Sequence, residues 1–178
     1  MEISCIDLSL SNIWQSYFEF KKGKKSSQKS EIFNYYLEEN LRALHFDLEN
    51  EKYSHGRYRK FIVTDNKRRE ISVADIRDRV IHRLIYEYLN GIYDHTFIFD
   101  AWSCRKNKGL IGAIERAQKF LRQNPNGYIW RSDIKKFFDS IDQQILIKII
   151  CRKIKDSKAL ILLREIIRSY KLEQNERE

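Results

Sequence analysis

The segment Arg131–Asp142, with the sequence RSDIKKFFDSID, has the residue types and order of a site for phosphate chemistry. Residues 128–134 alternate as a short strand does, which would place Asp133 at the strand end, and a turn into a helix follows. A carboxylate fixed by a strand can bind a metal ion, while free N–H groups at the next helix start can bind phosphate. The plainer interpretation is that Asp133 caps that helix and that Phe137 and Phe138 belong to the core.

The elements that must position this segment are mostly helical, with a single predicted β-hairpin. Residues 57–73 predict two strands, because Phe61, Val63, Ile71 and Val73 alternate around a turn near residues 65–67. Apolar residues at helical spacing predict further helices, the first of them capped by Ser30 and the second ending near Gly91. These helices are expected over about residues 30–50, 75–92, 109–123, 142–154 and 157–170.

Composition favours a polyanionic partner and excludes several protein classes. The 178 residues include 34 Lys and Arg against 25 Asp and Glu, which gives a formal charge of +9, and basic residues crowd residues 21–30 and 57–69. With six glycines, the chain has neither GxxxxGK[ST] nor GxGxxG, so a P-loop NTPase and a Rossmann enzyme are not expected. The sequence shows no secretion signal and no apolar membrane span, and three dispersed cysteines do not form a disulfide framework. A cytoplasmic location is therefore expected.

Four segments in order resemble the N-terminal half of bacterial reverse transcriptases, especially those of group II introns, retrons and diversity-generating retroelements. They are KRREISVADIRDRVIHRLI, FIFDAWSCRKNKG, AIERAQKFL and YIWRSDIKKFFDSID, within about residues 55–170. The shared motifs are an R-x-I block, a D-R-V-[IV]-H helix start, an F-I-x-D…C-R-K-x-K-G loop and D-I-x-x-F-F-x-S-I-D. The resemblance implies an α+β fold with mostly helical fingers, a basic β-hairpin, and the first palm strand and following helices of a right-hand polymerase. It also implies three regions: an N-terminal helical region with a basic loop (1–54), fingers (55–127) and a partial palm (128–178).

The resemblance also implies roles for individual residues. Asp133 would be the catalytic aspartate and a magnesium ligand, with the backbone carbonyl of Ile134 as a further ligand. The residues that would bind the incoming nucleotide are Lys67, Arg69, Arg79, Lys136, Phe137 and Phe138. The basic residues expected to contact nucleic acid are Arg57, Arg59, Lys60, Arg105, Lys106 and Lys108. The implied partners are an RNA template, a primer or cDNA, a dNTP and a candidate accessory protein of the retroelement, and no membrane.

One departure from the family bears on activity. The family continues into a template-grip motif and then Y-x-D-D, which supplies further metal-binding aspartates, and neither occurs by Glu178. Asp139 does not replace them, because six residues at about 100° each place it on another helical face than Asp133. Two Mg²⁺ ions about 3.5–4 Å apart need several converging carboxylates, so both ions are expected only in a complete palm. The expectation is an RNA-directed DNA polymerase fragment that is inactive alone.

Two alternatives stay open at this point. The first is a non-catalytic RNA-binding module derived from a reverse transcriptase, which the absent Y-x-D-D and the retained positive charge favour. The second is a basic helical protein that contacts only other proteins. Binding to RNA at low salt separates the two, because phosphate contacts are strongest there.

Overall fold

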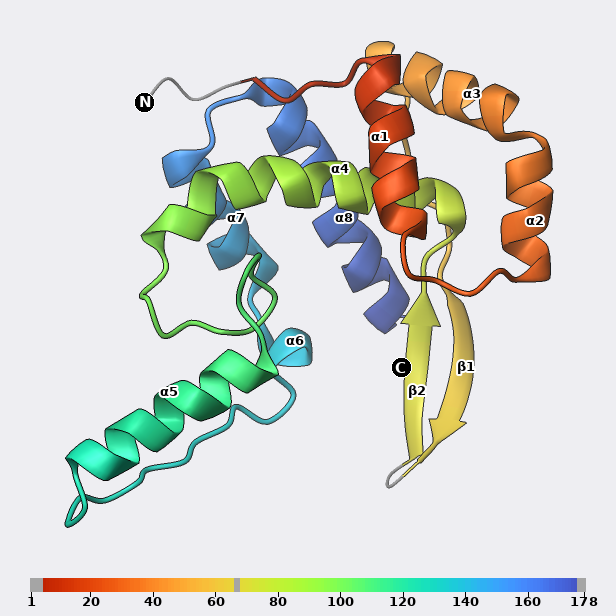
Figure 1. Ribbon diagram of the computed structural model, residues 1–178. Helices are drawn as coiled ribbons and strands as arrows, with labels where there is room; N and C mark the ends of the chain where they lie inside the picture. The colour runs from red at the N-terminus through yellow and green to blue at the C-terminus, as the bar shows by residue number, and fades with distance from the viewer. Residues whose placement is uncertain (1–4, 66–67, 176–178) are drawn as a thin grey trace. The chain divides into compact units, whose positions relative to one another are not determined.

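The computed structural model describes residues 5–65 and 68–175, and the chain divides into two compact units. Unit 1 consists of Met1–Tyr88 with Asp142–Glu178, and unit 2 consists of Leu89–Ile141. Helices dominate, and one two-stranded sheet completes the set of described elements (Figure 1). The α+β class expected from the sequence is therefore confirmed. Among the described residues, no helix combines the length and apolar character needed to cross a membrane.

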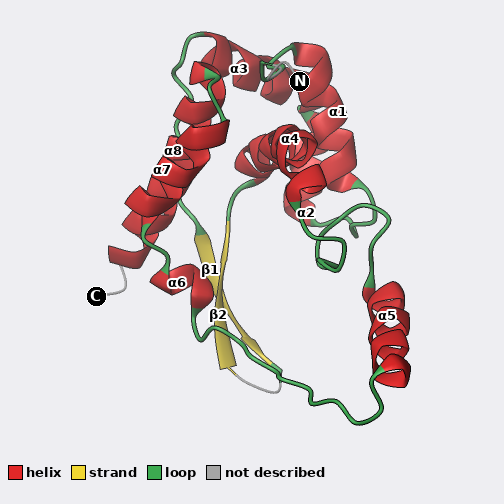
Figure 2. Cartoon of the chain, turned by 90° about the vertical axis from the view of Figure 1, so that its left-hand side faces the viewer, coloured by secondary structure: helices red, strands yellow, loops and turns green. Residues whose placement is uncertain are grey.

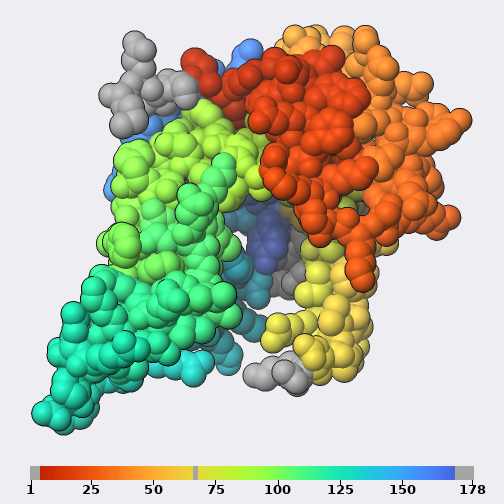
Figure 3. Space-filling model, viewed as in Figure 1, coloured from red at the N-terminus to blue at the C-terminus, as the bar shows by residue number. Residues whose placement is uncertain are grey.

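Three helices open unit 1: α1 (Leu10–Lys21), α2 (Gln28–Tyr35) and α3 (Leu37–Glu49). Their side chains form a continuous mass in the space-filling view, coloured red to orange (Figure 3). The expectation of one helix over 30–50 capped by Ser30 is wrong. Ser27 is the N-cap of α2 and forms a reciprocal capping box with Ser30, while Tyr36 leaves helical geometry at φ −103° and ψ 31° and separates α2 from α3.

The core of unit 1 forms where α1, α3, α4 (Ile76–Tyr93) and α8 (Ser157–Asn175) supply buried apolar faces. The predicted helix over 75–92 is present as α4, and it continues through Gly91 to Tyr93, so the expected stop at Gly91 is wrong. The last two predicted helices are also present, as α7 (Gln143–Lys153) and α8, which lie side by side in Figure 2. The most deeply buried apolar side chains are those of Ile13, Tyr17, Leu41, Leu44, Val80, Ile81, Leu84 and Ile154.

The predicted hairpin is confirmed and extends from this helical core. Strands β1 (Arg59–Thr64) and β2 (Arg68–Val73) pair antiparallel, with Arg59 opposite Val73 and Val63 opposite Arg69. Because side chains alternate between faces, Arg59 and Arg69 share one face of the hairpin and Lys60 lies on the other. The two arginines mark opposite ends of a face whose centre is apolar.

Unit 2 contains η1 (Asp94–Thr96), α5 (Leu110–Gln123) and the four-residue α6 (Phe137–Ser140). Helix α5 matches the prediction for 109–123. Residues 128–134 do not form the predicted strand: they are extended, but no described strand lies beside them to accept and donate ladder hydrogen bonds. Their side chains are correspondingly exposed, and Trp130 is 88% exposed.

Candidate nucleic-acid interface

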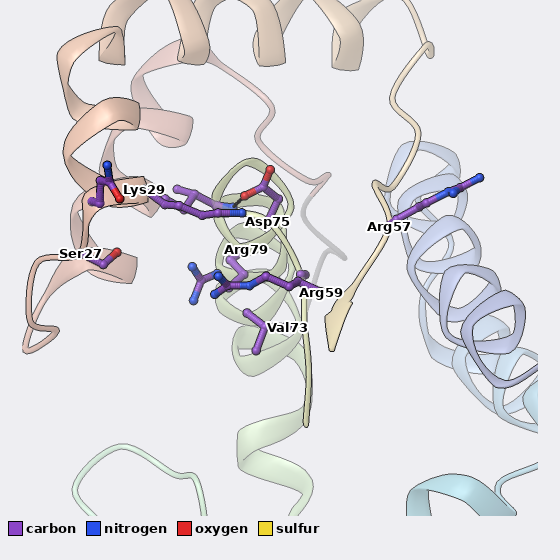
Figure 4. Close-up of a pocket in the computed structure, with 10 residues that line it drawn as sticks. Ser27, Lys29, Arg57, Arg59, Val73, Asp75 and Arg79 are labelled. Atoms are coloured by element: carbon purple, nitrogen blue, oxygen red, sulfur yellow. Dashed lines mark hydrogen bonds between the residues drawn. The ribbon is translucent and has the colours of Figure 1, made fainter. Parts of the chain in front are cut away.

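A basic pocket lies in unit 1, where the start of α2, the segment before β1 and the start of α4 come together. Its volume is about 340 Å³. Arg59 and Arg79 lie side by side in the close-up, whereas the side chain of Arg57 points away from them (Figure 4). Asp75 is the one acidic residue of the lining, which consists of Ser27, Gln28, Lys29, Arg57, Arg59, Val73, Ala74, Asp75, Ile76 and Arg79. The pocket therefore carries excess positive charge.

Arg79 brings to the pocket a buried hydrogen-bond donor that has no partner in the described part of the chain. Its Nε atom is buried and has no hydrogen-bond partner among the described residues. Burial lowers the pKa of the guanidinium, the nearby Asp75 charge raises it, and Arg59 lowers it further. The guanidinium carbon also lies 4.9 Å from the ring centroid of Phe20. An anion in the pocket would supply the missing hydrogen-bond partner and offset the repulsion from Arg59.

A second pocket of about 150 Å³ continues from the first and shares Ser27, Ile76 and Arg79 with it. Lys24 lines it, and its Nζ atom lies 3.5 Å from the ring centroid of Phe20. Burial lowers the pKa of Lys24, and the charges of Arg79 and Arg83 lower it further. The basic loop over 21–30 therefore brings cations next to Arg79. The charge run of this loop was the sequence signal, although no single lysine in it was predicted as a site residue.

The predicted site residues of unit 1 divide into two groups. Arg57, Arg59 and Arg79 line the same pocket, although they were expected in two different roles. Arg69 lies at the far end of the hairpin face that begins with Arg59, and Lys60 lies on the opposite face. Lys67 falls outside the described residues. The hairpin therefore distributes its charge over both faces and both ends, with Arg59 at the pocket.

In unit 2, two of the basic residues expected to contact nucleic acid are engaged within the chain. Arg105 donates from Nε to Asp94 Oδ1 at 2.7 Å and from Nη1 to two backbone carbonyl oxygens, those of Ile98 at 3.1 Å and Ala101 at 3.3 Å. The hydrogen bond from Arg105 lowers the pKa of Asp94. Lys108 donates to the carbonyl of Phe99 at 2.7 Å. These two residues order the connection over 94–109, and Lys106 is exposed on it.

Asp133 is exposed in unit 2, and its carboxylate makes no hydrogen bond or ion pair with another described residue. Lys136 follows in a left-handed conformation, φ 51° and ψ 43°, and precedes α6. Ile134, Phe137 and Phe138 are exposed as well, at 64%, 48% and 76%. Across 5–65 and 68–175, no group of three or more His, Cys, Asp or Glu residues could hold a metal ion. The described residues thus do not fit a two-magnesium centre.

A buried carboxylate holds the segment that leads into the pocket. Asp78, 1% exposed, accepts from the Tyr53 hydroxyl at 2.9 Å and from the Gly56 N–H at 3.1 Å. Beside it, the Nε2 atoms of His55 and His82 lie 3.1 Å apart, and the two rings stack with an interplanar angle of 18°. Burial, followed by the nearby His55, lowers the pKa of His82 to about 4. Sequence reasoning treated His82 as an ordinary half-buried residue and assigned Asp78 no role.

Comparison with known proteins gives partial similarity to three curated proteins. A Saccharomyces cerevisiae protein described as "Putative COX1/OXI3 intron 2 protein" is 27% identical over 107 residues, 60% of this chain and 12% of that protein. A Schizosaccharomyces pombe protein described as "Uncharacterized 91 kDa protein in cob intron" is 26% identical over 110 residues, 61% of this chain and 13% of that protein. "Protein YkfC" of Escherichia coli is 21% identical over 109 residues, 60% of this chain and 29% of that protein.

The chain thus spans 29% or less of the length of these relatives. No protein-family model matches the sequence. Similarity to two intron-encoded proteins agrees with the expected relation to a retroelement.

The intrachain contacts of Arg105 lead to a first prediction. Arg105→Lys keeps the charge but cannot reach Asp94 and two carbonyls at once, because lysine presents a single ammonium group. Backbone amides over 94–109 should exchange with deuterium severalfold faster in this variant, as measured by mass spectrometry. Lys106→Arg is the matched control and should leave exchange unchanged. Unchanged exchange in Arg105→Lys together with weaker RNA binding would instead assign Arg105 to the ligand.

The depressed pKa of His82 leads to a second prediction. The unfolded chain binds a proton at His82 near its ordinary pKa of 6.5, whereas the folded chain resists protonation down to about pH 4. Stability should therefore fall as pH drops from 6.5 to about 4, by roughly 2 kcal/mol after allowance for solvent screening. His82→Gln should remove this loss in urea unfolding measured across that pH range. His45→Gln, which alters a surface histidine on α3, should retain it; an equal loss in all three proteins would contradict the assignment.

Proposed function

We propose that this chain is the fingers and first palm part of an RNA-directed DNA polymerase, and that by itself it binds nucleic acid without polymerising. The single observation that carries the proposal is the basic pocket, whose lining includes Lys29, Arg59 and Arg79 but a single carboxylate, Asp75. The ordered motifs over about residues 55–170 and the similarity to intron-encoded proteins support the family. The partners proposed on this basis are an RNA template, a primer or cDNA and a dNTP.

Phosphate is the ligand class that best fits the pocket. Arginine presents several N–H donors in a plane and binds phosphate oxygens in pairs, and it stays charged at every physiological pH. Arg79 brings a buried Nε without a partner among the described residues, and Arg59 lies beside it. Each phosphate bound there would release condensed counterions from the nucleic acid, which makes the affinity depend on salt.

Binding of RNA to this pocket leads to a third prediction. Arg59→Gln with Arg79→Gln should weaken binding of a short single-stranded RNA by about tenfold or more, and reduce the slope of log affinity against log salt by one to two. Fluorescence anisotropy over a salt series measures both quantities. Arg42→Gln with Lys119→Gln removes the same charge at residues that do not line the pocket and should change affinity about twofold or less. Equal losses in the two double variants would mean that net charge, and not the pocket, binds the RNA.

Metal-dependent polymerisation is proposed only for a longer polypeptide, in which further residues contribute carboxylates to the metal site. Asp133 is the residue proposed to bind Mg²⁺, with the Ile134 carbonyl as a further ligand. Lys136, Phe137 and Phe138 are proposed to face the nucleotide, together with Lys67 and Arg69 of the hairpin. A single exposed carboxylate does not hold two divalent ions, so the 178 residues alone are proposed to be inactive.

The catalytic assignment leads to a fourth prediction, for a polypeptide that continues into Y-x-D-D. Asp133→Asn should lower cDNA synthesis from a primed RNA template by about a thousandfold or more, because the amide removes a negative charge from the metal site. Asp139→Asn is the control, since Asp139 is expected on a different face, and it should keep most of the activity. Primer extension measures both variants. Intact synthesis in Asp133→Asn would refute the catalytic role.

A non-catalytic RNA-binding module is the second candidate function. Two observations favour it: the described residues contain no cluster of three or more His, Cys, Asp or Glu that could hold a metal ion, and they do form a basic pocket. Both candidate functions include RNA binding. The RNA-binding module would not synthesise cDNA even as the protein encoded by the full reading frame. A native stop codon directly after Glu178 would support the module, and a frame that continues into Y-x-D-D would support the polymerase. Lack of RNA affinity at low salt would exclude both and favour a protein that contacts only other proteins.

A further inference from the structure

The segment Tyr53–Tyr58, called here the lead-in segment, connects the helical core to β1 and therefore sets where Arg59 lies. Helix α4 holds its first half, because Asp78 accepts from Tyr53 and Gly56, and Arg77 Nη1 donates to the Ser54 carbonyl at 3.1 Å. A Cβ atom at Gly56 would lie 3.0 Å from Asp78 Oδ2, so the segment approaches the carboxylate closely. Helix α4 also carries Arg79, so one helix positions both Arg59 and Arg79.

Helix α8 holds the same segment from another side. Glu165 accepts from the His55 N–H at 2.9 Å and from the Ser54 hydroxyl at 3.2 Å. The hydroxyls of Tyr58 and Ser169 lie 3.0 Å apart. The His55 side chain is fully buried, and its ring stacks between those of Tyr58 and His82, with centroid distances of 4.8 and 5.1 Å. His55 is thus the residue of the lead-in segment with contacts on every side.

The hydrogen bonds of His55 define the tautomers of both histidines. Its Nδ1 atom lies 2.7 Å from the Gly56 carbonyl oxygen, which can only accept, so Nδ1 carries the proton. The Nε2 atom of His55 is then an acceptor, and the Nε2 atom of His82, 3.1 Å away, must donate to it. A proton on Nε2 of His55 would point at the Nε2–H group of His82, so that two donors would face each other and the hydrogen bond between the rings would break.

We infer that His55 and His82 are positioning residues for the basic pocket: their hydrogen-bonded pair holds the lead-in segment so that Arg59 lies beside Arg79, and protonation of His82 favours release of the segment. This inference rests on the proposed function, since the pocket is taken to bind phosphate. The ionisable groups that face the pair are Asp78, Arg77 and Arg79 from α4, Glu165 from α8, and Tyr53 and Tyr58 from the lead-in segment.

The consequence is a pH dependence that the pocket's own cations do not produce. Arginine keeps its proton throughout the range in which histidine titrates. Loss of affinity in mild acid therefore reports on the histidine pair. With the pKa of His82 at about 4 in the closed state and 6.5 when released, lowering the pH to about 5 favours the open state by tenfold or more.

The first test examines the tautomers without any ligand. Imidazole ¹⁵N spectra of the whole 178-residue chain at neutral pH should show one histidine protonated at Nδ1 and accepting at Nε2, assigned to His55, and one protonated at Nε2, assigned to His82. His82→Gln should leave the His55 tautomer unchanged, because the glutamine amide can donate to the same nitrogen. Protonation of both His55 and His82 at Nε2 would overturn the inference, whether or not the chain binds RNA.

The second test measures affinity for a short oligouridylate at constant ionic strength from neutral pH to about pH 5. Uracil takes up no proton in this range, so the ligand does not contribute to the pH dependence. The affinity of the unaltered chain should fall by up to about tenfold, that of His82→Gln by a smaller factor, and that of His45→Gln as in the unaltered chain. Circular dichroism at each pH restricts the comparison to folded protein, and His82→Asn serves as a second variant.

The two tests separate failure of the inference from failure of the proposed function. Absence of oligouridylate binding at neutral pH and low salt would refute the proposed function, while the tautomer measurement would still decide the histidine assignment. Normal binding at neutral pH with the same acid loss in His82→Gln would overturn the inference and leave RNA binding intact. An affinity that does not fall in acid would also overturn it.

Discussion

The buried Asp78 carboxylate is the interaction on which the arrangement of unit 1 depends. A buried charge is costly unless hydrogen-bond donors surround it, and Asp78 is supplied by Tyr53 and Gly56, which belong to a segment separate in sequence. The Arg77 guanidinium lies 3.6 Å from the same carboxylate. Satisfying one aspartate on α4 thus fixes the lead-in segment, and with it the start of β1 and the position of Arg59. The position of the pocket follows from the need to solvate this charge.

Arginines in the two units illustrate how identical side chains take opposite functions. Arg105 and Arg116 each pair with an aspartate of their own unit, Asp94 and Asp100, and so order the loop and helix around them. Arg79 has Asp75 nearby, but burial and Arg59 act against its charged form. A paired arginine has little further affinity to offer a phosphate, whereas an incompletely paired one gains from it. Pairing, and not the number of cations, therefore decides which basic residues are available to nucleic acid.

Periodicity predicted the elements whose stability is local, and it failed where a distant partner decides. Helices α4 and α5 and the hairpin follow from apolar spacing and turn chemistry within a few residues. The apolar spacing continues through Tyr36 and does not show the helix break there. At this break the side-chain amide of Asn40 donates to the Phe33 carbonyl at 3.1 Å. Residues 128–134 alternate correctly for a strand, yet a strand needs a neighbour to pair with.

The candidate site shows the same division between local and distant information. The charge run in residues 21–30 and the arginines of the hairpin were visible in the sequence, so the basic character of the interface could be predicted. Their grouping with Arg79 could not, because it depends on Glu165 and Asp78 meeting the lead-in segment across 110 and 22 residues. The pairing of His55 with His82, 27 residues apart, likewise has no sequence signature. Motif order predicts which residues belong to a site. The hydrogen bonds that those residues make within the chain decide which of them can still bind a ligand.

The basic pocket and the proposed metal ligand Asp133 lie in different units of this chain, and this bears on the two candidate functions. The pocket is built wholly from unit 1, out of α2, the lead-in segment, both strands of the hairpin and α4, and its charge does not depend on any metal ligand. Asp133 belongs to unit 2 and is exposed, and the described residues include no group of three or more His, Cys, Asp or Glu that could hold an ion. Because arginine keeps its charge without a cofactor, RNA affinity can persist where catalysis cannot. A polymerase fragment and an RNA-binding module would therefore have the same pocket, and they differ only in whether further carboxylates ever join Asp133.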